Sequence, residues 1–377
     1  MLPCQPLTFL MSDCAMTQSA YPHRRRAAVL SDFGAAENLS VQDIPTPPLR
    51  ADEMLVRVKA TSVNPIEWKI RRGLRLPLPK PLWRRLLGRP MILGIDFAGT
   101  VVAVGPGVDG YRAGDDVMGA FRFGGADAEY AVVRPGDRHT AVTHKPASLT
   151  YAEAGALPFA GLVALAGIET YGGLQAGSNA RVLVNGASGG VGHLAIQIAK
   201  RCLGAALVVG VCSSRNEAFV RQCGADDVMA YDRLPIASIP RHRPQWQGSF
   251  DLIFDAVGSD EAWTKLAPWL LSGSGRFVAA ALPQLSDGRA GEDANLIEGL
   301  AMGARLAARQ MGGRYRFIYG FFGDLPAKQG LPTLVQWVTE GKLVTRLAST
   351  YSLEELAQAH RESEAGRTVG KISVAIP

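Results

Sequence analysis

Cysteine and long hydrophobic runs are both scarce in this chain of 377 residues. The five cysteines contain no Cys-x-x-Cys pair, and none lies between Cys14 and Cys202, which excludes a disulfide framework and a cysteine-bound metal cluster. No apolar stretch approaches the roughly 18 residues that a membrane-spanning helix needs. Residues 1–26 have no basic region before their short apolar stretch, so we expect a disordered extension without a secretory signal, in a cytoplasmic protein.

Lysine is scarce as well, with nine residues, so the net charge of +6 comes mainly from arginine. Because 40 basic and 34 acidic residues nearly balance, the sequence does not indicate a nucleic-acid partner. One dense basic run, within residues 71–89, is interleaved with leucines and a tryptophan. We expect a loop with a solvated charged face there; the alternative is weak contact with an anionic membrane surface.

Histidine contributes no metal motif. None of the six histidines is paired with a cysteine or a second histidine at the spacing of a zinc site, so no metal ligand is predicted. We expect His193 on the surface of a helix.

The length predicts two domains, because one hydrophobic core stops growing at roughly 250–300 residues. From residue 27 to 154, short segments of alternating polarity are separated by glycine and proline, which predicts an all-β unit, a distorted barrel. Thr150 followed three residues later by Glu153 is a capping box and predicts the start of a helix that continues over 156–168.

From residue 155 to 324, apolar strands alternate with helical segments, which predicts an α/β fold with a doubly wound parallel sheet of the Rossmann type. Residues 325–377 end in two short strands, 347–351 and 371–376, which we expect to return to the first domain.

The sequence Asn-Gly-Ala-Ser-Gly-Gly-Val-Gly, residues 185–192, lies between a predicted strand and a predicted helix. In that context a glycine-rich loop indicates dinucleotide binding, with the backbone close to the pyrophosphate and the helix N-terminus facing it. An ordinary glycine-rich turn is the alternative. The predicted cofactor contacts are Gly186, Ala187, Ser188, Gly189, Gly190, Val191 and Gly192.

About 20 residues beyond such a loop, NAD-specific sites carry an acidic residue for the ribose 2′-hydroxyl. This chain instead has Ser213, Ser214 and Arg215, which can bind a 2′-phosphate, so NADPH is favoured over NADH. Lys200 and Tyr231 are further candidates for this pocket, with surface exposure and edge packing as their alternatives.

Three segments resemble the medium-chain dehydrogenase/reductase superfamily: residues 62–73, residues 94–99 with 114–119, and the glycine-rich loop. Together they span most of residues 27–377, and the chain is most similar to the zinc-free quinone oxidoreductase branch. The resemblance implies a GroES-like catalytic domain built from both ends of the chain, a Rossmann domain between them, and a cleft where they meet. It also implies a homodimer.

Zinc enzymes of this superfamily carry a cysteine where this chain has Asn64, and Gly-His-Glu where it has Gly94, Ile95 and Asp96. One carboxylate falls short of the three protein ligands that catalytic zinc needs. Without a Lewis acid, alcohol oxidation is disfavoured, whereas hydride transfer from NADPH to a conjugated acceptor remains feasible.

By resemblance, Asn64 lines the nicotinamide site and can donate to a substrate carbonyl, while Lys69 and Arg71 follow it around the pocket. The alternatives are that Asn64 caps the Asn-Pro turn and that both basic residues are solvated. Phe321 and Phe322 resemble an aromatic pair beside the nicotinamide, with core packing as the alternative.

These observations predict a zinc-independent, NADPH-dependent reductase of quinones or α,β-unsaturated carbonyl compounds. One alternative is an NADPH-binding protein without turnover, which Val163 in place of an expected threonine and the basic run would suit. The other is an alcohol dehydrogenase, which the missing zinc ligands oppose.

Overall fold

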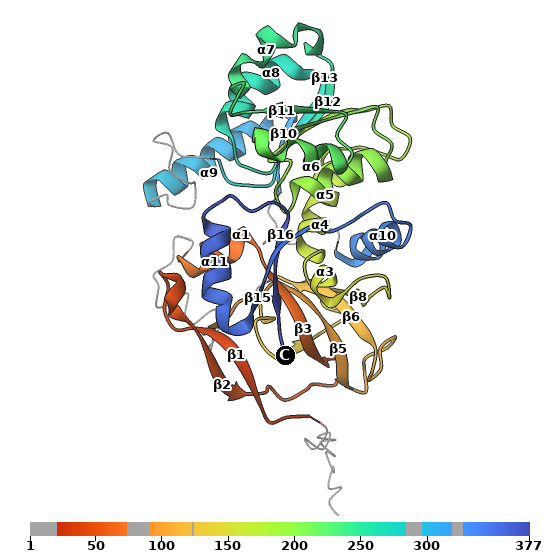
Figure 1. The fold of residues 1–377 in the computed structure, drawn as a ribbon, viewed down its shortest axis with the longest axis vertical. Helices are drawn as coiled ribbons and strands as arrows, with labels where there is room; N and C mark the ends of the chain where they lie inside the picture. Colours follow the sequence, from red (N-terminus) through yellow and green to blue (C-terminus); the bar gives the residue numbers. More distant parts are fainter. Residues whose placement is uncertain (1–20, 74–90, 123, 284–295, 319–326) are drawn as a thin grey trace, which may run out of the picture.

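The computed structural model describes residues 21–73, 91–122, 124–283, 296–318 and 327–377, and its strands form three sheets (Figure 1). The smallest sheet has the order β2-β1-β4, and both of its pairings are antiparallel. Its strands are β1 (Arg24–Leu30), β2 (Leu39–Pro45) and β4 (Met91–Ile92).

The second sheet has seven strands in the order β15-β16-β3-β5-β6-β8, with β7 also paired to β3. β16 pairs antiparallel with β3, so the C-terminal strands return to the sheet of the first β unit, as the sequence predicts. The strands are β3 (Met54–Val63), β5 (Asp96–Val104), β6 (Asp116–Phe121), β7 (Tyr130–Val133), β8 (Thr140–His144), β15 (Leu347–Ser352) and β16 (Lys371–Ala375).

The third sheet has six strands in the order β11-β10-β9-β12-β13-β14, and every pairing is parallel, which confirms the predicted Rossmann sheet. The first of these strands, β9, lies between β10 and β12, so the strand order reverses beside it, where open α/β sheets bind ligands. The strands are β9 (Arg181–Asn185), β10 (Leu207–Cys212), β11 (Asp227–Ala230), β12 (Phe250–Asp255), β13 (Leu271–Ala279) and β14 (Tyr315–Phe317).

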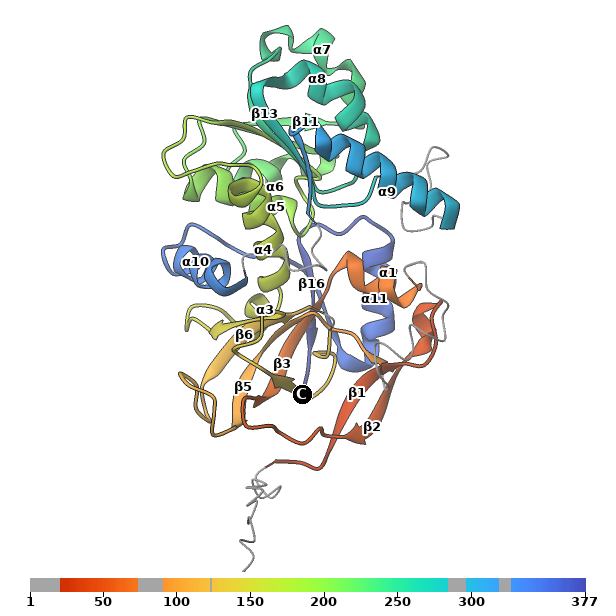
Figure 2. The same cartoon turned by 180° about the vertical axis from the view of Figure 1, so that it is seen from behind.

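Two helices, α4 and α5, lie between the seven-stranded sheet and the parallel sheet (Figures 1 and 2), and their apolar residues share one buried core with β9 and β10. No helix in the described part of the chain is long and apolar enough to cross a membrane. The helices are α1 (Pro65–Arg71), α3 (Tyr151–Ala154), α4 (Pro158–Leu165), α5 (Gly192–Gln197), α6 (Glu217–Gln222), α7 (Ile239–His242), α8 (Ala267–Leu270), α9 (Leu296–Met311), α10 (Ala327–Thr339) and α11 (Leu356–Glu364).

The capping box at Thr150 is present, with both reciprocal hydrogen bonds to Glu153 formed. It caps the short helix α3 rather than the longer apolar helix. A second helix, α4, begins separately at Pro158, a residue that suits the first turn because it has no N–H to leave unpaired.

Candidate active site

The glycine-rich loop turns sharply at the carboxyl end of β9. Gly186 has a φ of +78°, a conformation that favours glycine, and the amides of Gly186 and Ala187 donate to the Val211 carbonyl at 3.2 and 3.0 Å. A Cβ on Gly192 would lie 2.1 Å from the Gly186 carbonyl oxygen, so α5 can start this close to the sheet only with glycine there. The loop therefore has the close backbone approach that a dinucleotide site requires.

Gly370, which precedes β16, and Lys371, its first residue, lie against this loop. The Gly370 amide donates to the Ser188 carbonyl at 3.0 Å, and Gly189 forms a parallel bridge with Gly370. A Cβ on Gly190 would lie 2.9 Å from Cδ of Lys371. The middle of the Lys371 side chain therefore lies beside the dinucleotide loop, and its ammonium extends toward the seven-stranded sheet.

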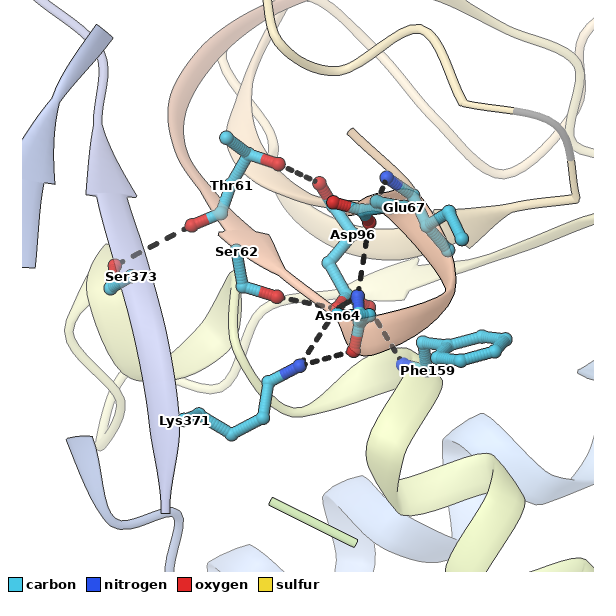
Figure 3. Close-up of polar contacts among 9 residues, drawn as sticks. Thr61, Ser62, Asn64, Glu67, Asp96, Phe159, Lys371 and Ser373 are labelled. Atoms are coloured by element: carbon cyan, nitrogen blue, oxygen red, sulfur yellow. Dashed lines mark hydrogen bonds and ion pairs between the residues drawn. The ribbon is translucent and has the colours of Figure 1, made fainter. Parts of the chain in front are cut away.

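There Lys371 joins a group of buried polar residues, shown in Figure 3, that we call the Asn64 cluster. Each member has an exposed fraction of 3% or less. Pairing of β16 with β3 aligns Ile372 with Val63, which places Lys371 opposite Asn64. The members of the cluster are Ser62, Asn64, Glu67, Asp96 and Lys371.

Asp96 is the acceptor at the centre of the cluster. Its Oδ2 accepts from Ser62 Oγ at 2.6 Å, from Asn64 Nδ2 at 2.9 Å and from Lys371 Nζ at 3.4 Å. Its Oδ1 accepts from the backbone amide of Phe159, the second residue of α4, at 2.7 Å. Both oxygens are therefore occupied by donors from three parts of the chain.

The Asn64 amide is fully engaged within the cluster. Its Nδ2 donates to Asp96 and also to Glu67 Oε1 at 3.1 Å, while its Oδ1 accepts from Lys371 Nζ. An NH2 group has two hydrogens, and both have acceptors here. In this geometry Asn64 has no donor left for a substrate carbonyl, and it does not cap the Asn-Pro turn with its side chain either.

Two further buried carboxyl groups are Glu67, within the cluster, and Asp127, beside it. Glu67 accepts from the Ile95 amide at 3.0 Å, yet burial raises the pKa of Glu67 to about 7. Burial, and then the nearby charge of Glu67, raise the pKa of Asp127 well above its ordinary value. The two groups therefore hold protons more tightly than exposed carboxyls do.

The two predicted basic residues of α1 differ in their surroundings. The Arg71 guanidinium, 1% exposed, bonds the Gly34 carbonyl and pairs with Glu364 of α11 at 2.6 Å. A side chain buried this deeply is out of reach of a substrate, so Arg71 lies outside the site and joins α1 to α11 instead. Lys69 is partly buried, with its Nζ 5.5 Å from the ring centre of Trp68.

The residues predicted for the cofactor 2′-phosphate follow β10. Ser213 is 9% exposed, and its Oγ has no hydrogen-bond partner among the described residues. The Arg215 side chain is exposed, and Tyr231, after the neighbouring strand β11, is 53% exposed. Asn216, which the sequence analysis missed, donates from Nδ2 to Ser188 Oγ at 3.1 Å and so ties this segment to the glycine-rich loop.

The prediction that Lys200 closes this pocket is wrong. Its Nζ pairs with Asp226 at 2.8 Å and donates to the carbonyls of Ala205 and Ala206, on the side of the sheet where β11 begins. Gly192 and Lys200 are eight residues apart on one helical path, and at 1.5 Å per residue that is roughly 12 Å. Lys200 therefore lies near the opposite edge of the sheet from the glycine-rich loop.

The expectation of an exposed His193 is also wrong, since His193 is 0% exposed. Its Nδ1 lies 2.9 Å from the Gly189 carbonyl and its Nε2 accepts from the Arg346 amide at 3.2 Å. Burial lowers the pKa of His193 to about 4. The neutral ring thus links the glycine-rich loop to the segment that leads into β15.

Phe321, Phe322 and most of the basic run, residues 74–89, lie outside the described residues. Among the residues that are described, no group of three or more histidine, cysteine, aspartate or glutamate side chains could hold a metal ion.

A nicotinamide dinucleotide fits the residues present. The glycines at 186 and 192 permit close approach of a pyrophosphate, and the unpartnered, buried Ser213 Oγ is a polar group that a ligand at the end of β10 can satisfy. Ser188, Gly189, Gly190 and Val191 are all partly exposed, as a loop that contacts a ligand requires.

A parallel Rossmann sheet with this loop, joined to a GroES-like sheet through β16, defines a medium-chain dehydrogenase/reductase. Residues 50–165 match the alcohol dehydrogenase GroES-like domain family, and residues 223–374 match the zinc-binding dehydrogenase family. The chain belongs to the medium-chain dehydrogenase/reductase superfamily, among its quinone oxidoreductase-like members.

Individual relatives agree with this assignment. The chain is 33% identical to the mitochondrial NAD(P)H oxidoreductase RTN4IP1 of Bos taurus over 92% of this chain and 87% of that one. It is 40% identical to a chloroplast envelope quinone oxidoreductase homolog of Arabidopsis thaliana, over 52% of this chain and 58% of that protein. It is 31% identical to a 2-methylene-furan-3-one reductase of Solanum lycopersicum, over 66% of this chain and 61% of that protein. The matches to these two plant relatives therefore span less than two thirds of their length.

Among solved structures, the quinone oxidoreductase from Coxiella burnetii superposes with a TM-score of 0.75 at 28% identity. The comparison covers 94% of this chain and all of that one.

Proposed function

We propose that the protein is a zinc-independent reductase that uses NADPH to reduce quinones or the C=C bond of α,β-unsaturated ketones and aldehydes. The proposal rests on the contacts of Lys371. Its side chain packs against Gly190 of the dinucleotide loop, and its ammonium donates to Asn64 and Asp96. One side chain thus joins the cofactor site to the residues that replace the zinc ligands.

The Asn64 cluster supports a mechanism without zinc. The three positions that would provide zinc ligands hold an amide, an isoleucine and a carboxylate, and four donors already occupy the carboxylate of Asp96. A divalent ion would have to displace these bonds in a fully buried site, which costs roughly 1.5–3 kcal/mol for each hydrogen bond to the carboxylate that is lost.

The chemistry divides between the cofactor and this chain. Reduced nicotinamide, when bound, supplies the hydride. The glycine-rich loop would hold the pyrophosphate, and Ser213 and Arg215 would favour a 2′-phosphate. Asn64 and Lys371 act as positioning residues that fix the strand ends around the reacting groups. We assign Lys69, which follows on α1, as the donor to the oxyanion that develops on the acceptor.

Consumption of NADPH by the purified protein tests the proposal. The acceptors are a benzoquinone, a naphthoquinone, a short enone, a 2-alkenal and a simple ketone, with NADH as the comparison. We expect turnover of the conjugated acceptors only, with NADPH preferred, and no loss after dialysis against a chelator. Tight NADPH binding without turnover would instead indicate a binding protein, and stoichiometric zinc with activity lost on chelation would contradict the proposal.

The resemblance to quinone oxidoreductases also leads us to propose a homodimer in the cytoplasm. Light scattering during size-exclusion chromatography tests the assembly: a mass of twice 40.2 kDa is expected, and a single-chain mass would contradict it.

A further inference from the structure

The carboxylate of Asp232 lies beside the segment that follows β10, although its position in the sequence does not predict this contact. Asp232 comes just after β11, and β10 and β11 are neighbouring parallel strands, so their carboxyl ends meet at one edge of the sheet. The Ser214 amide donates to Asp232 Oδ1 at 2.9 Å, and Ser214 Oγ donates to Asp232 Oδ2 at 2.8 Å. Tyr231, the residue before Asp232, donates its amide to the Cys212 carbonyl at 3.0 Å and holds the two segments together.

This contact changes what Ser214 can offer. A serine hydroxyl has one hydrogen, and Ser214 gives it to Asp232, so it is not available to donate to a phosphate. Ser213 differs, because its buried Oγ has no partner among the described residues. Of the three residues expected to bind a 2′-phosphate, Ser213 and Arg215 therefore remain as donors. Ser214 instead binds the carboxylate of Asp232.

The carboxylate of Asp232 is charged at neutral pH. Hydrogen bonds from the Ser214 amide and hydroxyl lower the pKa of Asp232 below its ordinary value. Its neighbour Arg233 pairs with Glu217 at 3.0 Å, and in the described part of the chain no ion pair to Asp232 is formed. A negative charge at this edge repels a 2′-phosphate, whereas it can accept a hydrogen bond from a ribose 2′-hydroxyl.

We propose that Asp232 is a specificity-determining residue that opposes binding of the NADPH 2′-phosphate and brings the affinities for NADPH and NADH closer together. The inference rests on the proposed function in one respect, namely that a nicotinamide dinucleotide occupies this site. Arg215 and Ser213 favour the phosphate, Asp232 disfavours it, and the balance between the two charged side chains sets the preference.

Affinity measured without turnover tests this proposal. Dissociation constants for NADPH and NADH are obtained by calorimetry for the wild type, Asp232→Asn and Arg215→Gln. Asparagine keeps an acceptor for the Ser214 amide and removes the charge. We expect Asp232→Asn to bind NADPH about fivefold more tightly, with NADH unchanged or weaker, and Arg215→Gln to shift the ratio in the opposite direction. The gain of Asp232→Asn should shrink as salt is raised, because the charge is exposed.

Asp227→Asn is the control for the loss of a carboxylate charge far from the cofactor, since Asp227 lies at the other end of β11, where it pairs with Arg221 and Arg243. Asp232→Ser is a second variant that removes the charge with a different side chain. Equal changes in both affinities, a change of the same size in Asp227→Asn, or unchanged affinities in both Asp232 variants would overturn the inference while the proposed function stands. A wild type that binds neither cofactor would overturn both.

Discussion

Lys371 and Asn64 are 307 residues apart in the chain, yet the Lys371 ammonium donates to the Asn64 side-chain carbonyl inside a buried cluster. The same ammonium lies 3.4 Å from Asp96, which is 0% exposed. Within a buried ion pair, removal of one partner leaves an uncompensated charge, which is strongly destabilising. Lys371 therefore stabilises the cluster and, through Gly190, fixes its position relative to the dinucleotide loop.

Replacement of this lysine should destabilise the fold. We expect Lys371→Met to lower the free energy of unfolding by about 3 kcal/mol, as measured by urea denaturation, because Asp96 loses its cation. The double variant Asp96→Asn with Lys371→Met should recover part of the loss, since neither charge then remains. Lys342→Met, at an exposed pair with Glu340, serves as the control and should behave like the wild type. Equal losses in the single and double variants would contradict the pairing.

Replacement of Lys69 should lower activity, whereas replacement of Arg71 should lower stability, although the two residues are only two positions apart on α1. Lys69→Met should lower kcat/KM at least tenfold with little change in unfolding, because we assign its ammonium to the developing oxyanion. Lys69→Arg should recover part of the activity.

Arg71→Met should instead lower the free energy of unfolding by about 2 kcal/mol, because the buried bonds of Arg71 to Glu364 and to the Gly34 carbonyl are lost, although Arg72 still pairs with Glu364. Its KM should stay near that of the wild type. Steady-state kinetics and urea denaturation on both variants make the comparison. A large activity loss in a stable Arg71→Met protein would return Arg71 to the site.

The predictions from sequence succeeded where the determining contacts are local. The capping box from Thr150 to Glu153 spans four residues, and the glycine-rich loop is a continuous segment, so the pattern alone identifies both. The alternation of strands and helices also predicts the parallel sheet, because parallel strands require crossover connections.

The failures concern contacts that only the folded sheets create. Ser214 and Asp232, which are 18 residues apart in the chain, come into contact because β10 pairs with β11. Lys371 contacts Asn64 because β16 pairs with β3. A lysine at the start of an apolar C-terminal strand was the available signal for Lys371, but no spacing rule connects it to Asp96. The prediction for Lys200 was wrong because Lys200 is close to the loop in sequence but not in space, since the intervening residues form a helix that leads away from the loop.

Gly192 provides a test of the dinucleotide loop. A Cβ there would lie 2.1 Å from the Gly186 carbonyl, so Gly192→Ala must push α5 away from the turn. We expect NADPH affinity to fall at least tenfold by calorimetry, because the loop amides lose their alignment on the pyrophosphate. Gly303→Ala is the control, since a Cβ there meets nothing within 4 Å and lies inside helix α9. That variant should bind like the wild type; unchanged binding by Gly192→Ala would exclude this loop as the cofactor site.

Glu67 should make stability depend on pH in a direction opposite to that of most carboxylates. Burial raises the pKa of Glu67 from 4.5 to about 7, so the folded protein binds this proton more tightly than the unfolded chain does. The stabilisation is fully present below about pH 4.5 and is lost as the pH rises through 7.

Glu67→Gln removes this titration and keeps a polar side chain of the same shape. Relative to the wild type, the variant should gain free energy of unfolding between pH 4.5 and 7, by on the order of 1 kcal/mol per pH unit, and show a constant difference at lower pH. The lowered pKa values of His193 and His360 act in the opposite direction, but they are common to both proteins and cancel in the difference. Urea denaturation of both proteins across this range provides the comparison. A difference that is flat from pH 4.5 to 7 would mean that Glu67 is charged in the folded protein throughout, and that the cluster holds no proton there.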